Sequence, residues 1–399
     1  MCGQQEMVRA KWKMVVSLIL FMVSPGDGLF HAVYRSILVS QSFKGDAGQP
    51  LFLSPYIKNG KIKEGQRKSM VSPFPGMNDK SYAGYITVNQ TYNSNLFFWF
   101  FPARMQPEDA PVVLWLQGGP GGSSMFGLFV EHGPYIITSN MTVVARDFPW
   151  TFTLSMLYID NPVGTGFSFT DHFQGYATSE DDVAQDLYSA LIQFFTLFPE
   201  YAKNDFYVTG EILDKLLDGD VTTGSSFFQN VTGCTNYYNI LQCTEPKEQS
   251  YFAKFLTLPQ VRQAIHVGNQ NFSDGAEVEK HLREDTVKSV KPWLSEIMNY
   301  YKVLIYNGQL DIIVAAALTE RSLMAMDWKG SRAYRRARRK VWKIFKSDNE
   351  VAGYVRRVGK FHQVIVRGGG HILPYDQPMR SFDMINRFIY DRGWEPYNS

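Results

Sequence analysis

The segment that most constrains the fold is residues 205–211, a short apolar run that ends in Gly-Glu. Such a run fits a buried strand that enters a tight turn. In a nucleophile elbow the strand continues into Gly-x-Ser-x-Gly, which places the serine on a strained turn between strand and helix. On this frame, residues 210–214 are Gly-Glu-Ile-Leu-Asp, so Ile212 holds the serine position. No intact Gly-x-Ser-x-Gly occurs elsewhere in the 399 residues. The sequence therefore predicts a hydrolase-like strand without its reactive residue.

Apolar runs of strand length recur along the chain and alternate with helical patterns. The aromatic and β-branched segments 82–88 and 96–101 predict a strand pair. Further strands are expected within residues 111–116, 156–160, 302–311 and 361–371, and helices within residues 180–198 and 381–390. Strands that alternate with helices favour a mostly parallel sheet covered on both faces. The predicted fold class is therefore α/β, supported by a hydrophobic content of 45% that is sufficient for a large core.

The composition changes along the chain and suggests five parts. We expect a signal peptide at 1–28, a propeptide-like arm at 29–80, core regions at 81–211 and 300–399, and a cap or insertion at 212–299. The arm is assigned from its Gly, Pro, Lys and Ser content, which suggests an exposed and partly ordered segment. The insertion is assigned because strand patterns are hard to find in it.

The N-terminus has the layout of a secretory signal. Three basic residues precede the apolar run 14–23, and a small or polar exit sequence follows it. That run is too short to span a bilayer comfortably, and no later segment approaches the roughly 20 apolar residues required. We therefore expect the secretory pathway, with a lysosomal or extracellular destination or retention in the endoplasmic reticulum, and no membrane span.

Four Asn-x-Ser/Thr sequons agree with export, and they predict glycosylation at Asn89, Asn140, Asn230 and Asn271. Only two cysteines, Cys234 and Cys243, lie beyond the predicted signal peptide. A local disulfide between them is one alternative in an oxidising compartment. The other is that both have lost partners elsewhere, and the sequence does not decide between the two.

Charge and motif content exclude several function classes. The formal net charge is only +2, and the single strongly basic run, residues 332–343, has helical spacing. A solvated helix face is the favoured interpretation of this run, and nucleic-acid binding is the alternative. No cluster has metal-ligand spacing. The Gly-rich stretch 117–124 lacks the Lys-Ser/Thr pair of a phosphate-binding loop. We expect no metal, no cofactor and no nucleic-acid partner, and the oligomeric state is not predicted.

The acid and the base of an acyl-transfer site are present in hydrolase order. In α/β-hydrolases the nucleophile, the acid and the base follow successive strands. Asp311 follows one predicted strand and His371 follows the next, after three glycines that allow a close approach of the loop. Residues 117–124 follow another strand, so their backbone N–H groups can converge on an oxyanion. An aspartate that caps a helix and a structural histidine are the alternatives for the first two residues.

Four ordered motifs, at residues 115–124, 159–168, 307–311 and 369–371, resemble those of the serine carboxypeptidases from about residue 80 to the C-terminus. The resemblance implies an α/β-hydrolase fold and the removal of C-terminal residues from peptides at acidic pH. It implies that Asp311 and His371 belong to a catalytic triad. Oxyanion and substrate-binding roles fall on Gln117, Gly118, Gly119 and Glu211, with Gln117 and Glu211 gripping the substrate's terminal carboxylate.

The chain departs from this family pattern after Glu211. The family continues with the serine, a helix and another central strand, whereas Ile212 begins a stretch that resembles a later cap helix. We therefore expect one central strand and its helix to be missing, and a chain that is inactive because the serine is absent. Two alternatives stay open: a pseudoenzyme that binds peptides with a free C-terminus, and a poorly folded product of an in-frame deletion.

Overall fold

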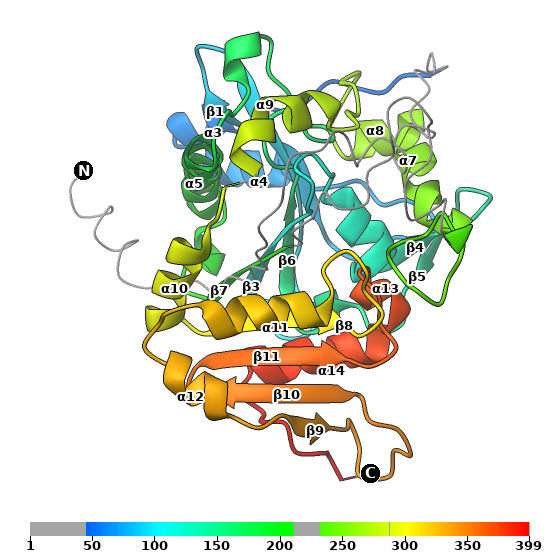
Figure 1. The fold of residues 1–399 in the computed structure, drawn as a ribbon. Helices are drawn as coiled ribbons and strands as arrows, with labels where there is room; N and C mark the ends of the chain where they lie inside the picture. The colour runs from blue at the N-terminus through cyan, green and yellow to red at the C-terminus, as the bar shows by residue number, and fades with distance from the viewer. Residues whose placement is uncertain (1–44, 211–231, 287, 399) are drawn as a thin grey trace.

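The computed structural model describes residues 45–210, 232–286 and 288–398. Their framework is a five-stranded sheet and a four-stranded sheet, whose strands run in different directions in Figure 1. A small two-stranded sheet consists of β4 (Tyr135–Ile137) and β5 (Val143–Ala145). The predicted signal peptide lies outside the described residues. Within them, no helix is both long enough and apolar enough to cross a membrane.

The five-stranded sheet has the order β1-β2-β6-β3-β7. Its strands are β1 (Tyr82–Asn89), β2 (Ser94–Phe101), β3 (Val112–Leu116), β6 (Ser155–Ile159) and β7 (Phe206–Gly210). β3 is parallel to β6 and β7, whereas β2 is antiparallel to β1 and β6. Each strand predicted from residues 82 to 211 is confirmed. The continuous apolar runs are explained by burial, because side chains on both faces of β3 and β6 are covered.

The four-stranded sheet has the order β8-β11-β10-β9. Its strands are β8 (Val303–Gly308), β9 (Lys340–Trp342), β10 (Gly353–Val358) and β11 (Phe361–Val366). β8 and β11 are parallel, and β10 is antiparallel to β9 and β11. The sheet contains both of the strands predicted in the last hundred residues.

Among the described strands, β7 is one edge of the first sheet and β8 is one edge of the second. In a continuous hydrolase sheet, these two strands would belong to one parallel array. The absence of one central strand and its helix stays a prediction, because residues 211–231, which follow β7, lie outside the described residues. Within the described part of the chain, β7 and β8 each have a strand partner on one side only.

Helix α5 (Glu180–Leu197) covers one face of the five-stranded sheet. It begins after Ser179, whose hydroxyl accepts a backbone N–H bond, and three acidic residues in its first turn favour the positive end of the helix dipole. Phe194 packs edge-on against Phe98 and Phe100 of β2. The predicted helix at residues 180–198 is confirmed.

Residues 45–80 are ordered and partly buried, in contrast to the exposed, partly ordered arm that was expected: Leu53 packs on this side of the sheet, whereas Phe74 and Met77 pack into the other core cluster. They form α3 (Ser54–Lys58) and α4 (Ile62–Ser69). Leu53 is fully buried, and its N–H donates to the Tyr85 carbonyl at 2.8 Å. The polar composition concealed this packing because the few apolar side chains bury themselves against residues distant in the sequence.

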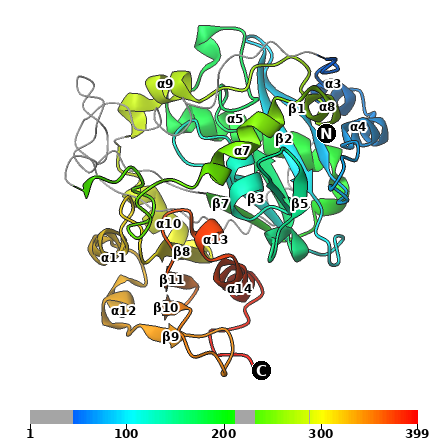
Figure 2. The ribbon, with the colours of Figure 1, turned by 90° about the vertical axis from the view of Figure 1, so that its right-hand side faces the viewer.

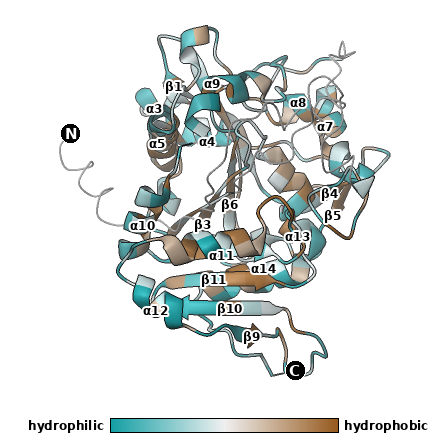
Figure 3. Cartoon of the chain, viewed as in Figure 1, coloured by the Kyte–Doolittle hydropathy of each residue, from teal (hydrophilic) through white to brown (hydrophobic). Residues whose placement is uncertain are grey.

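The second sheet lies between two helical layers, as Figure 2 shows. One layer contains α10 (Lys291–Tyr300), α11 (Ala316–Ala325) and α12 (Ser331–Arg336), and the other contains α13 (Leu373–Asp376) and α14 (Pro378–Ile389). α14 also reaches the first sheet, because the Tyr207 hydroxyl of β7 donates to the Ile389 carbonyl. The Trp150 indole, from the turn before β6, donates to Ser381 of the same helix. The C-terminal helix therefore joins the two sheets around one core, which Figure 3 shows as brown interior strands.

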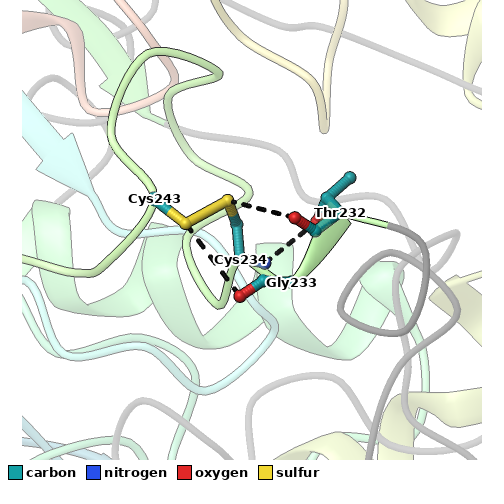
Figure 4. The surroundings of a disulfide bond; sticks show 4 residues. All are labelled: Thr232, Gly233, Cys234 and Cys243. Atoms are coloured by element: carbon teal, nitrogen blue, oxygen red, sulfur yellow. Dashed lines mark hydrogen bonds between the residues drawn. A yellow bond between two sulfur atoms is a disulfide. The ribbon is translucent and has the colours of Figure 1, made fainter.

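The described part of the insertion contains helices and loops, with no strand assigned. Its helices include α7 (Tyr251–Leu256), α8 (Pro259–Ala264) and α9 (Ala276–Thr286), and α10 begins near its end. Cys234 and Cys243 form a disulfide, with their Cα atoms 4.6 Å apart, which settles the pairing that the sequence left open (Figure 4).

Candidate active site

Asp311 and His371 lie together at one end of the second sheet. β8 and β11 are parallel and in register to their ends, with Gly308 opposite Val366, so the residues that follow leave the sheet at the same edge. His371 Nδ1 lies 3.0 Å from Asp311 Oδ2. Asp311 Oδ1 accepts the Val314 N–H at 2.9 Å, which fixes the plane of the carboxylate. The arrangement is that of a base oriented by an acid.

Burial and charge act in opposite directions on the His371 imidazole. The side chain is only 6% exposed, and burial by itself lowers its pKa. The charge and hydrogen bond of Asp311, together with the charge of Glu131, outweigh this effect, so the pKa is raised above 6.5. Because Asp311 accepts the Nδ1 proton, Nε2 is the nitrogen that can take a proton from a nucleophile. Within the described residues, the buried Nε2 has no hydrogen-bond partner.

The loop that carries the histidine is held by the disulfide-closed loop of the insertion. The His371 N–H donates to the Tyr238 carbonyl at 2.7 Å. Asp376 accepts the Gly370 N–H at 2.7 Å and the Asn239 side-chain amide at 2.9 Å. These three polar partners were missed in the sequence. The only local signal was a pair of cysteines that enclose turn-forming residues.

The Gly-rich loop after β3 is built around a buried carboxylate. Asp160, at the end of β6, accepts the Ser123 hydroxyl at 2.7 Å, the Ser124 N–H at 3.0 Å and the Phe167 N–H at 2.8 Å. Burial raises the pKa of Asp160 to about 7, although these bonds act to lower it. The two serines therefore have structural partners. Asp160 was not singled out from sequence, because an aspartate after a strand is a common feature.

Glycine is required where this loop meets the insertion. Gly121 has φ +104°, and a Cβ at this position would lie 2.7 Å from the Gly275 carbonyl oxygen. The following π-helical turn, Gly127–Glu131, packs against α13. Because α13 begins two residues after His371, this contact connects the oxyanion-type loop with the histidine loop.

Gln117 is oriented by its neighbour on β3. The Trp115 indole N–H donates to Gln117 Oε1 at 2.9 Å, which turns the amide nitrogen toward the other side. Leu116 pairs with Gly210 in the parallel register of β3 and β7, so the two strands end side by side at the same edge of the sheet. Gly118 and Gly119 follow in the partly exposed half of the loop. Positions 211 and 212, which carry the predicted substrate contact and the replaced nucleophile, lie outside the described residues.

A family model described as serine carboxypeptidase matches residues 72–212 and 223–391. The chain belongs to the serine carboxypeptidase family. Curated relatives agree with this assignment. The chain is 82% identical to the probable serine carboxypeptidase CPVL of Mus musculus and 63% identical to that of Homo sapiens, with 98% of this chain and 100% of each relative covered. It is 39% identical to the venom serine carboxypeptidase of Apis mellifera, over 96% of this chain and 100% of the relative.

The fold comparison points to the same architecture. The crystal structure of Kex1, a prohormone-processing carboxypeptidase from Saccharomyces cerevisiae, superposes with a TM-score of 0.70. The match covers 82% of this chain and 96% of Kex1 at 19% identity, so it supports the fold alone. The predicted α/β-hydrolase fold and the predicted family are thereby confirmed.

The predicted glycosylation sites of the chain differ in how exposed their asparagine side chains are. Asn140 and Asn271 are exposed, and Asn89 is half-buried at the end of β1. The Asn89 side chain accepts the Thr91 N–H at 3.0 Å. Asn230 lies outside the described residues. Two sites thus have the surface position that an attached glycan requires.

Proposed function

We propose that this chain is an inactive member of the serine carboxypeptidase family, in which the acid, the base and the oxyanion-type loop remain and the nucleophile is absent. One observation carries the proposal: the buried Nε2 of His371, oriented by Asp311, has no hydroxyl partner within the described residues. The sequence supports it, because Ile212 holds the serine position of the elbow.

The length of the relatives supports a deletion. The alignment with the mouse relative extends over 478 positions but includes only 98% of this 399-residue chain, or about 391 residues. About 87 positions of the relative therefore have no counterpart here. The family model is also interrupted between residues 212 and 223. A gap at this point would remove the serine together with a strand between β7 and β8.

The chemistry explains why the remaining residues are insufficient. In acyl transfer the base takes the proton of the serine hydroxyl while the oxygen attacks the scissile carbonyl, and the backbone donors stabilise the oxyanion. Without the hydroxyl, His371 has no side-chain nucleophile to activate and no acyl-enzyme forms. Removal of a triad nucleophile lowers turnover by a factor on the order of 10⁶.

A fluorophosphonate probe tests the proposal, because it reacts with an activated serine. We expect no labelling of the purified chain and no release of C-terminal residues from peptides by mass spectrometry. The mouse relative is the positive control, and the His371→Ala variant measures the background. Stoichiometric labelling that disappears in this variant would show that another serine has become the nucleophile.

A second candidate function is the binding of peptide C-termini, and the orientation of Gln117 favours it. The indole bond holds the Gln117 side chain in place directly after β3, where it would bind a carboxylate together with Glu211. Glu211 would share the carboxylate in its protonated form, so affinity should increase as the pH falls. Calorimetry with one peptide as free acid and as amide tests this function, with Gln117→Leu as the matched variant. Equal affinities for acid and amide would exclude it.

We also infer that the chain enters the secretory pathway and reaches a lysosomal or extracellular destination, or is retained in the endoplasmic reticulum. The signal-like N-terminus and the exposed Asn140 and Asn271 support this inference. Glycosidase treatment of protein from cells should increase its gel mobility, and an unchanged mobility would argue against export. Limited proteolysis tests the poorly folded alternative, since the packed core described above predicts a resistant fragment.

A further inference from the structure

The segment from Lys329 to Lys346 concentrates positive charge on one part of the surface. These residues include nine Lys or Arg and no Asp or Glu, whereas the whole chain has a formal net charge of only +2. The segment contains α12 and the edge strand β9. It takes no part in the acid–base site, so its charge needs a separate explanation.

The fold turns the basic side chains outward. In α12, Ser331 and Tyr334 are buried, whereas Arg332 and Arg336 are exposed and lie one turn apart on the same side. Arg338 is exposed in the connection to β9. α12 and β9 both contact β10 and lie along the same end of the molecule, where Figure 3 colours α12 and the adjoining end of β10 as hydrophilic.

The exposed cations are not neutralised by neighbouring acids. Glu320 pairs with two arginines, Arg356 at 2.9 Å and Arg339. Within the described part of the chain, no ion pair involves the surface formed by Arg332, Arg336, Arg338 and Lys340, which we call the basic surface. Burial and the charge of Arg356 lower the pKa of Arg339, which is consistent with accumulated positive charge nearby.

We propose that the basic surface binds a sulfated polysaccharide of the heparin class. Guanidinium groups bind tetrahedral oxyanions through paired N–H donors, and three of the four residues are arginines. Basic runs of this density are typical of heparin and nucleic-acid sites. The inferred export favours the sulfated glycan, because that polyanion is the one an exported protein meets. Positive charge on an edge strand also discourages strand pairing, but this does not account for the exposed arginines of α12.

The experiment measures binding of a heparin oligosaccharide to the full chain at about 0.15 M ionic strength, where long-range attraction is screened. The test variant is Arg332→Ala with Arg336→Ala and Arg338→Ala. The matched control, Lys58→Ala with Lys63→Ala and Arg67→Ala, removes three exposed charges from α3 and α4. We expect the test variant to bind about 10-fold more weakly and the control to bind within about 2-fold of the unmodified chain.

Two results would overturn the proposal. Equal weakening in both variants would show a response to overall charge, and binding of single-stranded RNA without binding of heparin would assign the surface to nucleic acid. A second measurement uses the unmodified chain, so its result does not depend on whether a variant folds. Heparin should protect Lys340 from acetylation while leaving Lys58 reactive, and uniform protection or none would contradict the proposal.

Discussion

Replacement of Asp160 by asparagine should flatten the pH dependence of stability. Burial raises the pKa of Asp160 in the folded state to about 7, whereas the ordinary pKa of an aspartate is 3.8. The folded state therefore holds the proton more tightly than the unfolded state. The resulting stability is fully present below pH 3.8 and is lost as the pH rises through about 7. At 1.36 kcal/mol per pKa unit, the loss amounts to about 4 kcal/mol.

The variant also carries a cost that does not depend on pH. Asparagine Oδ1 can still accept from Ser123 and Ser124, but its amide meets the Phe167 N–H, so two donors face each other. This mismatch should lower the free energy of unfolding by about 1–3 kcal/mol at every pH. We expect the variant to be less stable than the unmodified chain at pH 4 and equally or more stable at pH 7.5.

Urea unfolding followed by circular dichroism at several pH values measures this crossover. Asp182→Asn is the matched control, because bonds from Thr178 lower the pKa of Asp182 and reverse the sign. Its stability contribution is present at neutral pH and is lost on acidification. If Asp160→Asn and the unmodified chain have parallel pH profiles between pH 4 and 7, the carboxylate is ionised throughout and the reasoning fails.

Three further changes test the histidine loop and the core. Asp311→Asn should lower the pKa of His371, because burial then acts without the opposing charge of Asp311. NMR titration of His371 measures this pKa, and an unchanged value would show that the pair does not form. Serine at both Cys234 and Cys243 should lower the free energy of unfolding by about 2.5 kcal/mol, since the bond closes a short loop; an unchanged urea midpoint would contradict this. Arg387→Met leaves the buried Asp383 carboxylate without its cation, so the free energy of unfolding, measured by thermal unfolding, should fall by about 3–5 kcal/mol. A fall below about 1 kcal/mol would mean that water solvates the carboxylate.

The strand pattern could be predicted from local sequence because burial on both faces leaves continuous apolar runs. The same pattern placed Asp311 after one strand and His371 after the next, and the structure shows that these strands are parallel neighbours that end together. Residues 45–80 could not be predicted in this way. Leu53 is fully buried in a cluster formed by β1, β2 and α5, which are contributed by later parts of the chain.

The sequence by itself determined which segments along the chain form the strands, the chain positions of the acid and the base, and the lack of a serine in the elbow frame. Only the tertiary structure decided which polar groups lose contact with water. Asp160 and Asp311 both follow strands in the sequence, yet burial raises the pKa of Asp160 to about 7, whereas Asp311 pairs with His371. The physical reason is that desolvation and hydrogen bonding depend on atoms brought together from distant parts of the chain.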